Sequence, residues 1–125
     1  VSVMVTVTDS NGNISTGMAT VTVADNTPPT LSTQDVALSL DANGNASLTV
    51  DQVEVESADN CGIASKVLSQ SSFDCDDTGV NTVTLTVTDN AGNQTVNTFN
   101  VTISDDTAPT VIAQDLTIAL DNDGL

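Results

Sequence analysis

A small set of carboxylate and amide side chains, placed beside predicted turns and proline-containing segments, offers ligands suitable for calcium. The set comprises Asp25, Asn26, Asp59, Asp89, Asp105 and Asp106. Calcium in proteins takes six to eight oxygen ligands from carboxylates, amide carbonyls and the backbone. These residues are therefore the candidate metal ligands. The alternative is a plain solvated turn, because Asp-x-x-Gly-Asn is ordinary hairpin chemistry, and the turns lack the closing Glu of an EF-hand loop.

Other kinds of chemistry lack the residues that they need. The 125 residues contain no His, Trp or Tyr, and Phe73 and Phe99 are the only aromatic residues. A His-based catalytic triad or zinc site is therefore impossible within this sequence. Asp76 and Asp77 resemble paired carboxylates for acid–base catalysis, but adjacent acids in a polar loop favour a solvated surface. We predict no catalytic or cofactor-binding residue and no enzyme activity.

The charge balance restricts the partners. Seventeen acidic residues face a single basic one, Lys66, which gives a formal net charge of −16. Nucleic acids and anionic membrane surfaces attract clusters of Lys and Arg, so we expect neither as a partner. No apolar window approaches the roughly 18 residues of a membrane-spanning helix, so we expect no membrane insertion.

The candidate ligands must be positioned by β-strands, because apolar residues alternate with Thr and Ser along most of the chain. Clear examples are Val83, Leu85 and Val87, and Phe99, Val101 and Ile103. Alternation with many β-branched residues predicts strands that are buried on one face. Apart from one short turn within Asp51–Glu56, no helical period is present, so the predicted fold class is all-β.

The sequence repeats itself with a period of 80 residues. The run Val7-Thr-Asp-Ser-Asn-Gly-Asn13 matches Val87-Thr-Asp-Asn-Ala-Gly-Asn93, and the register holds to the end of the chain. Proline interrupts strand pairing, so the segments 25–30 and 105–110 are natural junctions. We interpret 1–26 as the C-terminal hairpin of a preceding repeat, 27–106 as one complete repeat and 107–125 as the first strand of the following repeat. Both ends then fall inside a repeat, which suggests a window cut from a longer tandem array and accounts for the missing signal peptide.

Each complete repeat is predicted to be an immunoglobulin-like β-sandwich. Its strands are short, tight turns are expected at Asp41–Asn45 and Asp89–Asn93, and the unit is below 100 residues. The buried Trp of antibody domains is missing, so an antibody-type domain is excluded.

This fold predicts where the candidate ligands lie. If the strands around Asp89 form an antiparallel hairpin, its turn lies opposite the exit at Asp105 and faces the incoming linker. Asp59 is expected at the same end. The predicted junction site therefore consists of Asp25, Asn26, Asp59 and Asp89, and Asp105 and Asp106 begin its equivalent at the next junction.

An ordered run of motifs links the sequence to a known family. The motifs are Asp59-Asn-Cys-Gly62, Phe73-Asp-Cys75, Thr82-Val-Thr-Leu-Thr-Val-Thr-Asp-Asn-Ala-Gly-Asn93 and Val101-Thr-Ile-Ser-Asp-Asp-Thr-Ala-Pro109. The whole 80-residue unit resembles a hyalin-repeat (HYR)-like module, and more narrowly the tandem repeats of very large secreted surface proteins of Bacteroidetes. Animal hyalin repeats commonly carry a cysteine on the last strand, and its absence from 99–103 favours the bacterial variant. The resemblance implies an extracellular adhesin or stalk array, often exported by the type IX secretion system, without catalytic residues.

Cys61 and Cys75 are the only cysteines. We expect a structural disulfide between them, because small β-modules have limited cores and closing a loop of about 15 residues stabilises by roughly 3 kcal/mol. Such a bond implies an oxidising compartment. The alternative is a pair of free thiols. A straight strand over 63–70 would separate its ends by more than about 20 Å, whereas a disulfide needs Cα atoms within about 7 Å, so the bond requires the chain to double back near 68–71.

The leading interpretation is a secreted, non-catalytic structural or adhesive repeat of a large cell-surface protein. It would act as a stalk or filament segment, stiffened by calcium at its junctions. The expected partners are neighbouring repeats of the same chain, with surface glycans or other cells bound by domains outside this sequence. The alternative is a spacer or glycan-binding module of a secreted enzyme. Glycan binding is the weaker interpretation, because sugars usually need exposed aromatic platforms and Phe73 and Phe99 are expected in or near the core.

Overall fold

The structure, a computed structural model, describes residues 1–124, and its regular secondary structure is almost entirely β-strand. The elements in chain order are β1 (Ser2–Thr8), β2 (Ile14–Thr20), β3 (Thr30–Thr33), β4 (Val36–Ser39), β5 (Ala46–Ser47), α1 (Val50–Val53), β6 (Glu54–Ala58), β7 (Ile63–Leu68), β8 (Ser72–Phe73), η1 (Cys75–Asp77), β9 (Gly79–Asp89) and β10 (Gln94–Ser104). The all-β prediction is confirmed, and the short helix α1 begins one residue before the predicted helical turn at Asp51–Glu56.

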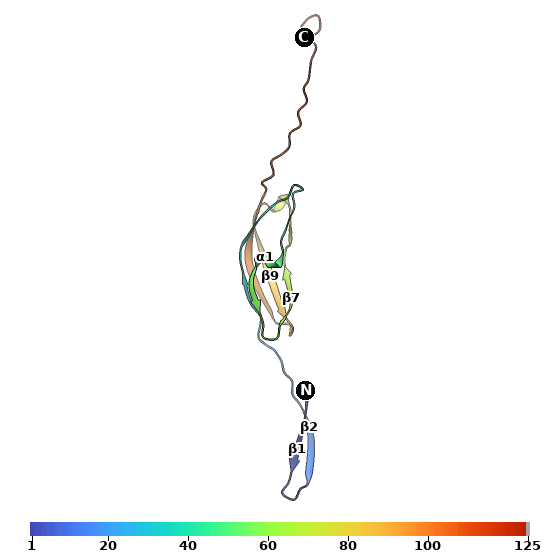
Figure 1. Cartoon of the computed structure of the whole chain (residues 1–125), viewed down its shortest axis with the longest axis vertical. Coiled ribbons are helices and arrows are strands. Elements are labelled where there is room, and N and C mark those ends of the chain that lie inside the picture. The colour runs from blue at the N-terminus through green and yellow to red at the C-terminus, as the bar shows by residue number, and fades with distance from the viewer. Residues whose placement is uncertain (125) are drawn as a thin grey trace.

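The central part of the chain is a β-sandwich (Figure 1). One layer is a four-stranded sheet in the order β4-β10-β9-β7, and the β3–β6 pair forms the second layer. The short β5–β8 pair is a further two-stranded sheet. The strands pair antiparallel except for β4, which runs parallel to β10. This arrangement is consistent with the predicted immunoglobulin-like sandwich.

The core follows the predicted alternation. From Val83 to Asp89 in β9 and from Phe99 to Ile103 in β10 every second residue is buried, and the neighbours between them are more exposed. The buried apolar residues are Leu40, Leu48, Val53, Phe73, Val83, Leu85, Val87, Phe99, Val101 and Ile103. Because the two long strands supply six of these side chains, the β9–β10 hairpin is the main support of the sandwich.

The flanking segments add nothing to this core. β1 and β2 pair antiparallel from Ser2↔Thr20 to Thr8↔Ile14, and every residue of both strands is exposed. Residues 105–124 form no strand and are likewise exposed. In Figure 1 the hairpin lies beyond one end of the sandwich and the C-terminal segment beyond the other. The division of the chain into repeats stays a prediction.

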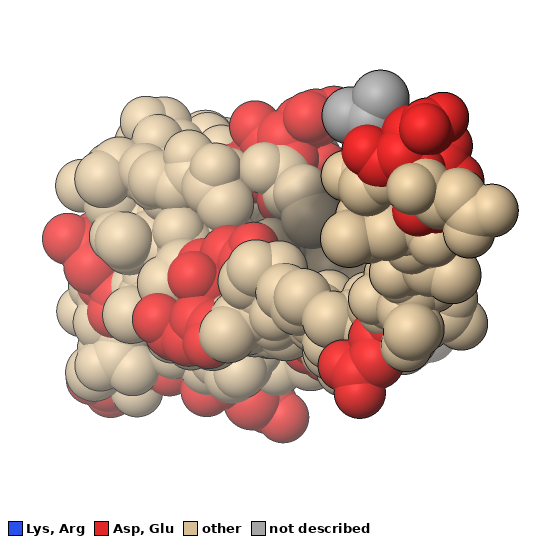
Figure 2. Space-filling view, turned by 90° about the horizontal axis from the view of Figure 1, so that it is seen from above, with Lys and Arg blue, Asp and Glu red and all other residues tan. Residues whose placement is uncertain are grey.

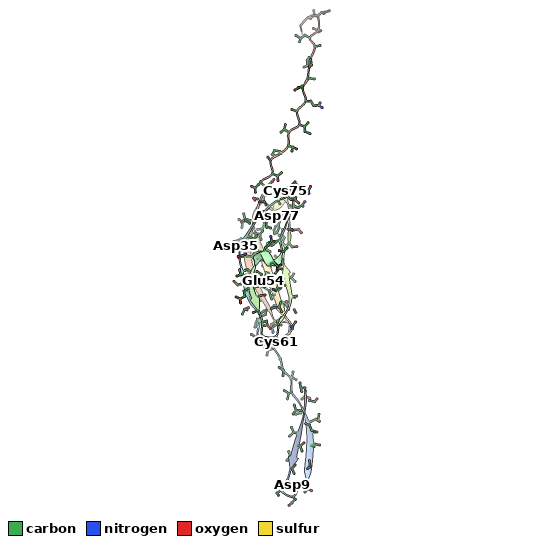
Figure 3. All side chains as sticks on the ribbon, in the orientation of Figure 1. Asp9, Asp35, Glu54, Cys61, Cys75 and Asp77 are labelled. Atoms are coloured by element: carbon green, nitrogen blue, oxygen red, sulfur yellow. The ribbon has the colours of Figure 1, made fainter. Side chains whose placement is uncertain are left out.

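The predicted disulfide between Cys61 and Cys75 is not formed. Both cysteines are free thiols, and Figure 3 places them near opposite ends of the sandwich. The chain after Cys61 does not double back, because β7 runs along β9 from Ile63↔Asp89 to Leu68↔Leu85. A strand of this length spans about 20 Å, far beyond disulfide reach. The disulfide prediction was therefore wrong.

Candidate cation site at the incoming end of the sandwich

Asp89 ends β9 and shapes the tight turn to β10. Its Oδ1 accepts hydrogen bonds from the backbone N–H groups of Ala91 and Asn93, and its Oδ2 accepts one from Asn93 Nδ2, all at 2.8 Å. Gly92 supplies the left-handed backbone (φ +96°) that the turn requires. The Asp89 side chain is only 1% exposed. Burial alone would raise the pKa of Asp89, but these hydrogen bonds outweigh it and hold the pKa below its usual value.

The incoming linker is held against this turn. The amide Nδ2 of Asn93 also donates to the Asp25 carbonyl oxygen at 3.2 Å, and Thr95 Oγ1 donates to the Pro29 carbonyl oxygen at 2.5 Å. Within the linker, Asp25 Oδ1 accepts from the Thr27 N–H at 3.0 Å. Asp25 is therefore fixed beside the start of β10 by contacts that join segments 66 to 68 residues apart.

The loop between β6 and β7 brings Asp59 to the same end. Asp59 Oδ2 accepts from the Cys61 N–H at 2.7 Å. Asn90 ties this loop to the β9–β10 turn, because its Nδ2 donates to the Cys61 carbonyl oxygen at 2.8 Å and its N–H donates to the Gly62 carbonyl oxygen at 3.0 Å. Gly62 has φ +95°, and a Cβ there would lie 2.9 Å from Asn90 Nδ2. Glycine is thus needed for this close approach.

The carboxylates of Asp25, Asp59 and Asp89 converge. One oxygen from each lies within 4.8 Å of the other two. Oxygens bound to one calcium ion at 2.3–2.6 Å lie at most about 5 Å apart, so the spacing suits such an ion. Asp25 Oδ2 and Asp59 Oδ1 are buried and accept no N–H or O–H donor within residues 1–124. Burying charged oxygens without a partner is unfavourable, so the cluster is suited to a cation.

The protein offers no basic side chain to neutralise this cluster. Lys66 is the only Lys or Arg of the sequence. Its Nζ on β7 pairs with Glu54 Oε1 on β6 at 2.5 Å, and Figure 3 shows Glu54 in the middle of the sandwich. The negative charge of the three carboxylates is therefore uncompensated by any residue of the chain.

The thiol of Cys61 lies beside the cluster. The pKa of this thiol is raised, first by its hydrogen bond to the Asp25 carboxylate, then by burial and by the charges of Asp25, Asp59 and Asp89. Cys61 was predicted to form a disulfide, and its contact with Asp25 was not predicted. The only local signal was Asp59 two residues earlier, because the Asp25 contact joins residues distant in sequence.

Asp105, another candidate ligand, lies outside the cluster, and for Asn26, the residue after Asp25, a role as a ligand stays a prediction. Asn26 is exposed, and within the described part of the chain its side chain forms no hydrogen bond with the cluster. Asp105 lies at the opposite end, where its Oδ1 accepts from the Thr107 N–H at 3.0 Å. This is the same local contact that Asp25 makes with Thr27.

Asp106 also lies at the outgoing end of the sandwich. Its Oδ2 accepts hydrogen bonds from Ser39 Oγ and Ser104 Oγ, both at 3.0 Å. Figure 2 shows acidic side chains in separate patches on this face, with no basic side chain among them. Residues 105 and 106 join no group of three acids among residues 1–124. A second cation site at this end stays a prediction.

The adjacent acids Asp76 and Asp77 serve the short η1 helix. The Asp76 N–H donates to Asp74 Oδ1 at 2.9 Å, and Asp77 Oδ2 accepts from the Asp74 N–H at 3.0 Å. Asp77 therefore takes part in capping this helix through its carboxylate, and Asp76 through its backbone N–H.

Comparison with known proteins identifies the sandwich. A model of the HYR domain family matches residues 24–103, which is more than half of the chain. The matched interval contains the whole buried core as well as Asp25, Asp59 and Asp89. A comparison with curated protein sequences finds no match. Within residues 1–124, no helix is long and apolar enough to cross a membrane.

Proposed function

We propose that this chain, which belongs to the HYR domain family, is a non-catalytic extracellular repeat that acts as a segment of a stalk or filament. HYR domains are non-catalytic repeat-type domains that are typical of extracellular and surface proteins. The proposal is that sandwiches of this kind follow one another end to end and hold other domains of a large surface protein away from the cell.

The observation that carries this proposal is the position of the two ends of the sandwich. The incoming linker is fastened beside the start of β10. β10 then runs for 11 residues, about 36 Å, and leaves at the other end. Figure 1 shows the flanking segments continuing in opposite directions along the long axis. Because the sequence repeats every 80 residues across both junctions, successive sandwiches would extend the array along this axis.

The proposal includes secretion and a role at the cell surface, with type IX export as the route that the resemblance implies. Adhesive contacts with glycans or other cells would come from domains outside this sequence. The partners of the repeat itself would be its neighbours in the same chain.

The structure offers little to a glycan-binding role, which was the alternative. Phe73 and Phe99, the only aromatic residues, are 2% and 4% exposed. Their predicted burial is confirmed. A shallow depression of about 230 Å³ near Asp59 is lined by Thr27, Pro28, Thr30, Ala58, Asp59 and Asn60, without an aromatic ring. A plain spacer within a secreted enzyme would use the same geometry. The sequence of the parent protein distinguishes the two roles, because a hydrolase domain would favour the spacer and many further repeats would favour the stalk.

Surface labelling tests the proposal. Antibodies raised against the 125-residue chain should label intact cells of the source organism, and protease added to those cells should remove the signal. A cytoplasmic protein should resist the protease under the same conditions. Labelling that requires permeabilised cells would contradict the proposed location.

A further inference from the structure

We infer that Asp25, Asp59 and Asp89 form a divalent-cation site, with calcium as the ion, which fastens the incoming linker to the sandwich. The three carboxylates come from three separate segments, namely the linker, the β6–β7 loop and the end of β9. An ion held by all three would join the linker to both layers of the sandwich, because β6 and β9 belong to different sheets.

Two observations independent of the acidic composition support this site. Asp89 is almost completely buried and contributes one oxygen to the cluster. Asp25 Oδ2 and Asp59 Oδ1 are buried and receive no N–H or O–H donor, and they are the only such side-chain oxygens within residues 1–124. Both unsatisfied oxygens therefore occur where the three carboxylates meet, as expected if a ligand satisfies them.

The repeated sequence supplies an internal comparison. Asp105 makes the same local hydrogen bond as Asp25, and Asp9 makes the same turn contacts as Asp89. Neither Asp9 nor Asp105 has a buried unpartnered oxygen within the described residues. The unsatisfied oxygen of Asp25 is therefore not a consequence of its local hydrogen bond, which Asp105 shares, but of its burial where three segments converge.

The ligand set favours calcium. All three groups are carboxylates, which suit hard cations, and the sequence has no His to favour zinc or copper. Three carboxylates leave several positions of a calcium shell to backbone carbonyls and water, as in extracellular calcium modules with a Kd of about 10⁻⁴ to 10⁻³ M. Magnesium requires near-ideal octahedral geometry and releases its waters reluctantly, so we expect weaker magnesium binding.

The role of this ion rests on the proposed array, in which each junction would repeat the site. With the ion bound, Asp25 is held to Asp59 and Asp89, so the linker leaves the sandwich in one direction. Without it, the linker is held by the hydrogen bonds from Asn93 and Thr95 and by the contact of the Cys61 thiol with Asp25. Calcium would then set the stiffness of the junction.

Calorimetric titration of the 125-residue chain with calcium chloride tests the site. Asp25→Asn and Asp59→Asn should each weaken binding at least ten-fold, because each removes a charged ligand while the remaining side-chain oxygen still accepts the local N–H. Asp9→Asn and Asp41→Asn are the controls, because each changes a turn carboxylate that accepts local N–H groups away from the cluster, and they should bind as the unchanged chain does.

Thermal melts of the same proteins give a second readout. Calcium at 100 times its Kd should raise the Tm of the unchanged chain by at least about 5 °C. In EDTA, Asp59→Asn should leave the Tm unchanged or raise it, because one of three like charges is removed. In calcium the same variant should melt below the unchanged chain. The difference in Tm between the variant and the unchanged chain would thus change sign between EDTA and calcium. A purely structural role of Asp59 would not produce this change.

Several results would overturn the site. They are no calcium binding by the unchanged chain, equal binding by all four variants, or a lower Tm of Asp59→Asn in EDTA. Equal affinity for magnesium would overturn the assignment of calcium. The proposed array is tested separately. The length of a multi-repeat protein can be measured in EDTA, where no calcium is bound, so the array can hold even if the calcium site does not.

Discussion

At the scale of single residues, the same Asp turn occurs three times in the chain, each time in different surroundings. Asp9, Asp41 and Asp89 each accept hydrogen bonds from backbone N–H groups two and four residues later. These turns were predictable, because Asp-x-x-Gly-Asn encodes them locally. The approach of Asp25 and Asp59 to Asp89 was expected from hairpin geometry, and the structure brings the three together. Which oxygens remain unpartnered depends on non-local packing, so the sequence alone could not identify them.

Cys61 should react slowly with alkylating reagents in the absence of metal ions. Its raised pKa leaves less thiolate at a given pH, and the thiolate is the nucleophile. In EDTA at pH 8, Asp25→Asn should increase the rate of Cys61 carbamidomethylation by iodoacetamide several-fold, because it removes the charge next to the thiol. Peptide mass spectrometry reports the rate, and Cys75 is the internal control. An unchanged Cys61 rate would show that Asp25 does not act on this thiol.

Both cysteines should titrate as free thiols. Protein purified without reductant, then alkylated in denaturant, should carry two labels per chain, because Cys61 and Cys75 lie near opposite ends of the sandwich. The melting temperature should also be the same with and without dithiothreitol. A chain that takes up no label would indicate the disulfide that the structure excludes.

At the scale of elements, local patterns and long-range pairings were not equally predictable. The alternation of Val83, Leu85 and Val87 was enough to predict the buried face of β9. The parallel pairing of β4 with β10 joins residues 65 apart, and the two-residue strands β5 and β8 are too short for a sequence period. The disulfide prediction was wrong because it ignored a long-range pairing. The path of β7 follows its pairing with β9, which keeps the two cysteines apart.

Equivalent positions of the two hairpins should respond differently to truncation. Leu85 of β9 is fully buried, whereas Val5 of β1, the residue 80 positions earlier, is 51% exposed. Leu85→Ala should lower the free energy of unfolding by about 2–5 kcal/mol. Val5→Ala should change it by less than about 0.5 kcal/mol. Urea denaturation of the 125-residue chain measures both, and a large effect of Val5→Ala would show that β1 packs in a core.

The one ion pair should make a small, pH-dependent contribution. Lys66 of β7 and Glu54 of β6 join the two sheets, and the hydrogen bond from Lys66 is the main cause of the lowered pKa of Glu54. Because the folded pKa lies below the unfolded value, the stabilisation is present at neutral pH and is lost as the pH falls through the folded pKa.

Lys66→Met should therefore cost about 1 kcal/mol at pH 7, given that Lys66 is partly exposed. The difference from the unchanged chain should shrink at an acidic pH, as Glu54 becomes protonated on crossing its lowered folded pKa. Urea denaturation at the two pH values measures this difference. A cost that stays equal at both values would mean that Lys66 acts through packing and not through its charge.

At the scale of the whole molecule, shape and charge are the properties that suit a stalk. The chain enters and leaves the sandwich at opposite ends (Figure 1), and its surface carries a formal charge of −16 that opposes association. The same charge opposes compaction of neighbouring sandwiches, so cations at the junctions would reduce the repulsion where repeats meet. Family membership and the sandwich fold agree with the proposed stalk.

Small-angle X-ray scattering of proteins with one, two and three copies of the 80-residue unit tests the central claim most directly. We predict that the maximum dimension increases linearly, by about 40 Å for each added unit, since each sandwich contributes the length of its 11-residue strands plus a short linker. The maximum dimension should increase with each added unit in EDTA as well as in calcium. In calcium the increase per unit should be more uniform, because the junctions are stiffer. A maximum dimension that grows only with the cube root of mass would mean that the sandwiches pack against one another, and would contradict the stalk.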